Sequence, residues 1–152
     1  MKKISNSMIC CWFLLIAFLP AEETGCNRSG IKGHLYRVSG NQMPSPGEPR
    51  PAPEGMKTTL YIYELTNTSQ VSRDGGSPFY RSVSTKPVRE IESGDDGSFE
   101  VKLNPGQYSL FVKKGDLFYA NIYDANNNIY PVEVIKGKMT VVDFRVDYDA
   151  AY

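Results

Sequence analysis

Histidine and cysteine are scarce in this sequence of 152 residues, and their scarcity limits its chemistry. The chain has one histidine, His34, whereas a zinc site of the type used by zinc hydrolases takes two histidines and a glutamate. Of its three cysteines, Cys10 and Cys11 lie in an apolar N-terminal run, which leaves Cys26 alone. No pair of cysteines remains to form a disulfide beyond that run. We therefore expect no metal, no cofactor and no disulfide in the folded part of the chain.

An excess charge of either sign is also missing. Lysines and arginines number 17, and so do aspartates and glutamates, which leaves a formal net charge of zero. A protein that holds nucleic acid needs a basic surface for the phosphate backbone. We therefore expect no nucleic-acid partner.

The apolar N-terminal run is too short to cross a membrane as a helix. It covers residues 8–19, which are 12 residues, against the roughly 20 that a spanning helix needs. Lys2 and Lys3 precede the run and Pro20 ends it, in the order typical of a signal peptide. We therefore interpret residues 1–25 as a signal peptide, and residues 26–152 as one exported domain.

The end of this segment resembles the cleavage site of bacterial lipoproteins, in which a small residue precedes a cysteine that is then lipidated. Here the pair is Gly25 and Cys26, although Glu23 stands where such signals usually have an apolar residue. A lipid on Cys26 would anchor the protein to a membrane of the bacterial envelope. Two alternatives stay open: cleavage after Ala21 would give a periplasmic or secreted protein, and an uncleaved segment would itself act as the anchor.

Helical periodicity is almost absent after residue 26, whereas strand signals recur between clusters of glycine, proline, asparagine and aspartate. Strands are predicted at residues 31–38, in "TTLYIYEL", at about 83–92, on either side of "NPG" at 104–106, in "IYPVEVIKG" and in "KMTVVDFRVDY". In the last of these, Val142, Phe144, Val146 and Tyr148 share the face that we expect to point inward. About seven strands without a helix of note predict an all-β fold, an antiparallel β-sandwich.

The stretch "DDGSFEVKLNPGQYSLFVKKG" is the most informative part of the sequence. "DDG" and "NPG" are turn sequences, and apolar residues alternate with polar ones after each. We predict that Gly97, Pro105 and Gly106 serve turn geometry, that Phe99 and Tyr108 pack in the core, and that the two strands form a β-hairpin.

This stretch, together with "TLYIYEL" and "VEVIKGKMTVVDFRV", resembles the carboxypeptidase regulatory-like domain over roughly residues 30–147. The whole chain looks most like small lipoproteins of Bacteroidetes-type bacteria that have this domain alone. The resemblance implies a transthyretin-like (prealbumin-like) sandwich that accompanies peptidases, transporters or surface proteins without being catalytic. The loops at 40–55 and 65–80 are longer than the family pattern, so a partner surface cannot be transferred to them.

Two segments are candidates for binding. Phe118, Tyr119, Asn121 and Tyr123 precede further asparagines and Tyr130, and rings beside amides suit a sugar. The alternative is that these rings belong to the core. The loop at 40–55 has five prolines and predicts an exposed polyproline II segment, which is either a docking peptide for a partner or a plain surface loop.

Three acidic or basic features are interpreted structurally. Asp95 and Asp96 fit a turn, and "DANNNI" begins like a calcium loop but lacks its glycine and final glutamate, so an asparagine-rich turn is predicted. His34 is expected to face solvent on the first strand, and no nucleophile motif accompanies it. We therefore expect a non-enzymatic module of the cell envelope that contacts a protein partner, or alternatively a glycan through residues 118–130.

Overall fold

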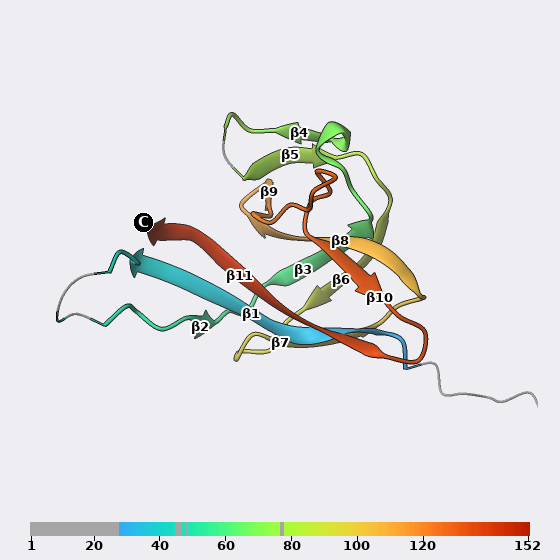
Figure 1. Cartoon of the computed structure of the whole chain (residues 1–152), viewed down its shortest axis with the longest axis horizontal. Coiled ribbons are helices and arrows are strands. Elements are labelled where there is room, and N and C mark those ends of the chain that lie inside the picture. The colour runs from blue at the N-terminus through green and yellow to red at the C-terminus, as the bar shows by residue number, and fades with distance from the viewer. Residues whose placement is uncertain (1–27, 45–46, 48, 77) are drawn as a thin grey trace, which may run out of the picture.

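The computed structural model describes residues 28–44, 47, 49–76 and 78–152, so the predicted signal peptide and Cys26 lie outside the described residues. Within these ranges the chain forms eleven strands and one 3-10 helix, arranged as two sheets (Figure 1). The predicted all-β sandwich is confirmed. The strands outnumber the seven expected because some, such as β2 (Glu54–Gly55) and β4 (Val71–Arg73), are too short to leave an alternating pattern.

The first sheet is built around β1 (Gly30–Asn41). The strand β11 (Met139–Ala151) pairs with β1 along nearly its whole length, and this is the one parallel pairing among the described strands. β7 (Ser98–Lys102) and β2 pair antiparallel with successive parts of β1. Beyond β7, the C-terminal halves of β1 and β11 project from the sandwich, and we call this pair the arm (Figure 1).

The second sheet has the order β4-β5-β9-β8-β3-β6, with β10 paired to β8, and all its pairings are antiparallel. Its further strands are β3 (Thr59–Glu64), β5 (Phe79–Val83), β6 (Pro87–Glu92), β8 (Gly106–Lys114), β9 (Leu117–Tyr119) and β10 (Pro131–Val134). The sequence predicts one strand over 83–92, and the structure divides it. Proline has no N–H for a ladder, so β6 starts at Pro87.

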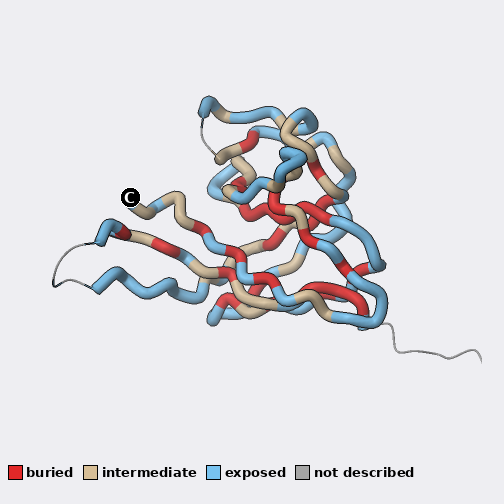
Figure 2. Tube along the Cα trace, in the orientation of Figure 1, coloured by how far each residue is buried: buried red, intermediate tan, exposed pale blue. Residues whose placement is uncertain are grey.

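The core lies between the two sheets, where apolar side chains of alternate residues meet. Figure 2 marks the buried residues in red along the trace of both sheets. Ile31, Leu35 and Phe144 from the first sheet and Leu60 and Leu110 from the second are fully buried. The inward face predicted for the last strand is confirmed, because Val142, Phe144 and Val146 are buried and Tyr148 packs against the same cluster.

The predicted hairpin of β7 and β8 is wrong. β7 pairs with β1 in the first sheet, whereas β8 pairs with β3 in the second, so residues 103–105 cross between the sheets. Tyr108 closes this crossing by donating its hydroxyl to the carbonyl oxygen of Asn104 at 2.8 Å. An alternating strand shows its apolar face to the core in either arrangement, so alternation alone could not distinguish a hairpin from a crossing.

The turn before β7 agrees with its predicted role. Gly97 has a φ of +81°, and a β-carbon there would come within 2.2 Å of the carbonyl oxygen of Leu35. Asp96 accepts a hydrogen bond from the backbone N–H of Ser98 at 2.9 Å. The side-chain hydrogen bond of Ser98, followed by this backbone bond, lowers the pKa of the Asp96 carboxyl. Phe99, which follows the turn, is 7% exposed and belongs to the core.

A second layer of rings covers the outer face of β8. Phe111 is fully buried there, with Tyr63, Tyr80 and Phe118 packed edge-on around it. The segment at 65–80, predicted as a polar loop, includes a 3-10 helix (Thr68–Gln70) and β4. Its Asn67 bonds the backbone of Asn126 at 2.7 Å, which ties it to the loop after β9.

Candidate functional site

The structure does not assemble the predicted sugar platform. Phe118 and Tyr119 are neighbours on β9, so their rings point to opposite faces of the sheet. Tyr119 is fully buried between the sheets, whereas Phe118 joins the outer rings, with the ammonium of Lys113 4.5 Å from its ring centre. A flat stacking surface therefore cannot include both.

The other aromatic residues of this segment are also held by the protein. Tyr123 is 39% exposed, but its hydroxyl is hydrogen-bonded to that of Tyr80. Tyr130 is 5% exposed and stacks on Phe144 with ring centres 4.2 Å apart. The core interpretation holds for Tyr119 and Tyr130, and of the four predicted binding residues Asn121 lines a groove of the described structure.

The predicted asparagine-rich turn is confirmed. The carboxylate of Asp124 accepts hydrogen bonds from the backbone N–H groups of Asn126 and Asn128 and from the Asn128 amide, each at 2.8 Å. The hydrogen bond from the backbone of Asn128, followed by the one from its side chain, lowers the pKa of the Asp124 carboxyl. The Asp124 carboxylate therefore accepts its hydrogen bonds from residues of the same turn, which it holds together.

His34 lies on β1 with its side chain 44% exposed, as predicted. Its Nδ1 is 4.0 Å from the Asp143 carboxylate, and its ring stacks on Tyr36. Within the described ranges, no three metal-ligating side chains come together.

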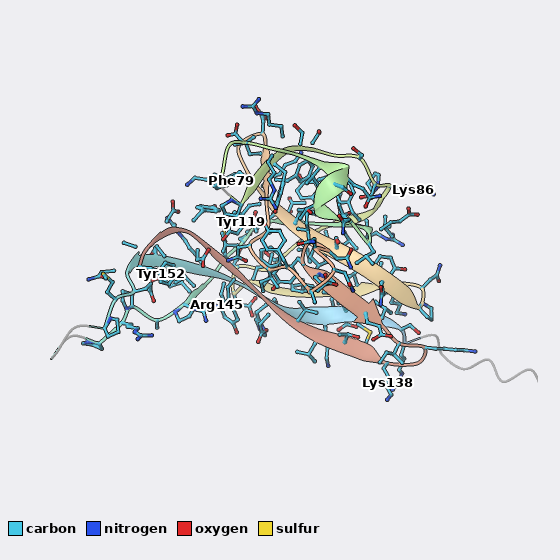
Figure 3. The ribbon with its side chains drawn as sticks, turned by 45° about the horizontal axis from the view of Figure 1, so that its top comes forward. Phe79, Lys86, Tyr119, Lys138, Arg145 and Tyr152 are labelled. Atoms are coloured by element: carbon cyan, nitrogen blue, oxygen red, sulfur yellow. The ribbon has the colours of Figure 1, made fainter. Side chains whose placement is uncertain are left out.

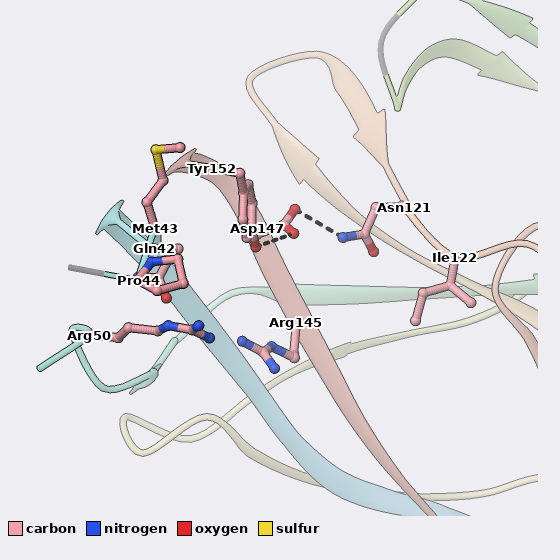
Figure 4. A pocket seen from close by; sticks show the side chains of 9 residues that line it. All are labelled: Gln42, Met43, Pro44, Arg50, Asn121, Ile122, Arg145, Asp147 and Tyr152. Atoms are coloured by element: carbon pink, nitrogen blue, oxygen red, sulfur yellow. Dashed lines mark hydrogen bonds between the residues drawn. The ribbon is translucent and has the colours of Figure 1, made fainter. Parts of the chain in front are cut away.

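A groove of about 610 Å³ lies beside the arm, and we call it the arm groove (Figure 4). One wall is the segment after β1, from which Gln42, Met43, Pro44 and Arg50 line the groove. The opposite wall is the segment after β9, with Asn121 and Ile122. Arg145 and Asp147 of β11, and Tyr152 beyond it, complete the lining. Figure 3 shows Arg145 where the arm leaves the sandwich and Tyr152 further out along the arm.

Asp147 is the centre of a hydrogen-bond network at one end of this groove. Its carboxylate accepts bonds from the hydroxyls of Tyr119 and Tyr152 and from the amide nitrogen of Asn121, the last at 2.9 Å. The backbone N–H of Asp147 also donates to the Tyr119 hydroxyl at 3.3 Å. Burial, followed by the bond to Asp147, raises the pKa of the Tyr119 phenol well above its ordinary range. The phenol is therefore a protonated donor at physiological pH.

The network fixes the orientation of the Asn121 amide. A carboxylate can only accept hydrogen bonds, so the amide nitrogen of Asn121 faces Asp147 and its oxygen points the other way. That oxygen is buried and accepts no hydrogen bond from the described residues. Buried polar atoms in native proteins nearly always have a partner. The Asn121 oxygen is thus an unfilled acceptor in the groove wall, and because protein atoms cover it, a donor from a ligand reaches it only when a lining side chain moves aside.

The other end of the groove is basic. The guanidinium groups of Arg50 and Arg145 point toward one another across it (Figure 4). The ion pairs of the described part include Arg37 with Asp149 and Arg81 with Asp74, but neither Arg50 nor Arg145. Among the described residues, therefore, no carboxylate forms an ion pair with either of these two guanidinium groups.

Most of this groove is missed by reasoning from the sequence. Arg145 and Asp147 occupy the outward positions of the predicted last strand, and that polar alternation is the one local signal for them. Arg50 lies in the proline-rich segment, about 95 residues from Arg145 in the chain. The parallel pairing of β1 with β11 brings the two segments together.

No family model matches the sequence, and no curated protein matches it significantly. Among the described residues, no helix is both long and apolar enough to span a membrane.

Proposed function

We propose that this protein is a non-catalytic binding module of the bacterial cell envelope, and that the arm groove is its binding surface. The observation that supports this best is the convergence of unfilled hydrogen-bonding capacity in one groove. Among the described residues, Arg50 and Arg145 have donors without an ion-pair partner, and the buried oxygen of Asn121 is an unfilled acceptor in the groove wall. Such convergent polar groups in a concave site are typical of ligand recognition.

The chemistry of these groups suits binding better than catalysis. Guanidinium groups stay protonated at any physiological pH, so Arg50 and Arg145 cannot act as bases. The Asp147 carboxylate already accepts three side-chain hydrogen bonds, which hold it in place as a structural acceptor. We expect these residues to orient and retain a ligand.

We further propose that the chain is a carboxypeptidase regulatory-like domain displayed by a lipid on Cys26. The support is the sandwich fold, together with the structural roles of the residues that carry the resemblance. Gly97 makes the turn, Phe99 is buried, and Tyr108 closes the crossing between sheets. Replacing Cys26 with Ser should move the protein from the membrane to the soluble fraction of the producing bacterium. Unchanged membrane retention would contradict lipidation.

Binding at the groove is tested by placing a photo-crosslinking amino acid at Ile122 in the producing bacterium. Ile122 is 48% exposed and lines the groove without joining the Asp147 network. Glu90, exposed on β6 at one edge of the second sheet, is the matched control. We expect discrete adducts from position 122 that position 90 does not give. Equal patterns from both positions would show that the groove is not a preferred binding surface.

A further inference from the structure

We infer that the ligand of the arm groove is an acidic saccharide, whose carboxylate binds between Arg50 and Arg145. This inference rests on the proposed binding function and names its ligand class. It is drawn from the two guanidinium groups, which form no ion pair with a described residue, and from the buried Asn121 oxygen, which no described residue fills.

The carboxylate follows from the geometry of the arginines. A guanidinium presents its N–H donors in a planar fork that matches the two oxygens of a carboxylate. Two like charges that face each other repel, and an anion between them removes that repulsion. In the described part of the chain no acidic side chain takes this position, although Asp147 lies in the same groove. Asp147 is instead engaged by Tyr119, Asn121 and Tyr152.

The saccharide follows from the second requirement, a hydrogen-bond donor for the Asn121 oxygen. A uronic acid holds a carboxylate and several hydroxyl donors on one rigid ring, so both ends of the groove can be satisfied by one unit. An acidic residue of a peptide has its carboxylate on a flexible stem, and its nearest donor lies on the backbone beyond rotatable bonds. Ordering those bonds would oppose binding.

Exposed apolar and aromatic surface lines the same groove. Tyr152 is 70% exposed, Met43 is 55% exposed and Ile122 is 48% exposed. The hydroxyl of Tyr152 is bonded to Asp147 at 3.0 Å, which holds its ring at the groove. A ring fixed in this way can cover the apolar face of a sugar while the arginines hold the acid group.

The test is a titration of the purified exported protein with oligogalacturonate, beside the methyl ester of the same oligosaccharide. The ester keeps the shape and the hydroxyls but removes the charge. We expect the acid to bind, the ester to bind at least roughly tenfold more weakly, and binding of the acid to weaken as salt is added. Equal affinity for acid and ester would overturn the inference.

Variants locate the site. Arg50→Gln and Arg145→Gln should each weaken binding of oligogalacturonate by roughly tenfold or more. Asn121→Ala should weaken binding of both the acid and the ester, because it removes a hydroxyl acceptor and not a charge. The matched control is Arg89→Gln on β6, which removes an exposed arginine of the other sheet and should leave affinity unchanged. Arg50 and Arg145 are exposed, so these variants should fold, as thermal melting would verify.

The outcomes separate this inference from the proposed function. Tighter binding of a polyglutamate peptide than of oligogalacturonate, with the same loss in the arginine variants, would overturn the saccharide and keep the groove. Binding of oligogalacturonate that is unaffected by the arginine variants would also overturn the inference. Absence of binding together with equal crosslinking at positions 122 and 90 would overturn the proposed function itself.

Discussion

Tyr119 of the second sheet donates its hydroxyl to the carboxylate of Asp147 on β11, the edge strand of the first sheet. A fully buried ring thereby connects the core to a residue that lines the arm groove. The hydroxyl also accepts the backbone N–H of Asp147, so side chain and backbone are both held. The packing of the sandwich and the shape of the groove are therefore coupled through this pair.

Tyr119→Phe should test that coupling. The variant keeps the ring but removes a hydrogen bond to a charged group, so we expect the free energy of unfolding to fall by roughly 1–3 kcal/mol. Because Asp147 also positions Asn121 and Tyr152, we expect weaker ligand binding as well. Urea unfolding measures the first effect and titration the second. Tyr36→Phe, on the half-exposed ring of β1, is the control that should change neither.

Alkaline pH should destabilise the fold through its buried tyrosines. Burial raises the pKa of Tyr130 to about 12, with Asp143 adding to the effect, and it raises the pKa values of Tyr80 and Tyr119 well above their ordinary range. Unfolded tyrosines ionise near pH 10. Above that pH the unfolded state loses protons that the folded state keeps, so stability present below pH 10 is lost as pH rises.

The measurement is a titration of phenolate absorbance beside circular dichroism. Of the ten tyrosines, we expect the buried ones to ionise late and together with loss of structure. Ionisation of all ten near pH 10 without unfolding would contradict the burial of Tyr80, Tyr119 and Tyr130.

Phe99→Ala should cost roughly 3–5 kcal/mol of unfolding free energy, because it leaves a cavity in the core between the sheets. Glu100→Ala, on the exposed face of the same strand, is the matched control and should stay within about 0.5 kcal/mol. A loss below 1 kcal/mol for Phe99→Ala, measured by urea unfolding, would mean that Phe99 does not lie on the buried face of β7.

Alanine substitutions at two glycines should distinguish the cost of backbone strain from the cost of a steric clash. Gly97 and Gly137 both have positive φ, at +81° and +77°, so an alanine is strained at either position. A β-carbon at Gly137 meets nothing within 4 Å, whereas at Gly97 it meets the Leu35 carbonyl oxygen at 2.2 Å. We expect Gly137→Ala to cost about 1 kcal/mol and Gly97→Ala at least about 2 kcal/mol more. Equal melting temperatures for the two variants would contradict the close approach of the turn to β1.

The fold class could be predicted from the sequence because it depends on local patterns. Alternation in the last strand identified the inward face of Val142, Phe144 and Val146, and turn chemistry identified Gly97. Pairing partners depend instead on contacts between distant segments. For this reason the alternation after Asn104 did not show that β8 leaves β7 and crosses to the other sheet.

The candidate site was less predictable than the fold for the same physical reason. Tyr119 and Asn121 are two residues apart, yet one is buried between the sheets and the other lines a groove. Their partner, Asp147, lies on a strand whose position follows from the parallel pairing with β1. Residue types suggested sugar recognition, but only the tertiary arrangement shows which side chains have bonding capacity left.

The parallel pairing of β1 with β11 also has a consequence for how the chain folds. The first long strand, β1, can pair with β11 only after almost the whole domain has been synthesised, because partners such as Leu35 and Phe144 are far apart in the sequence. Contacts of such long sequence separation require the closure of a large loop and slow the folding of β proteins. A chain that is synthesised or translocated from its N-terminus would therefore stay open until residue 139 and beyond have emerged. We expect folding to begin late and to be completed at the arm, so the groove is the last surface to form.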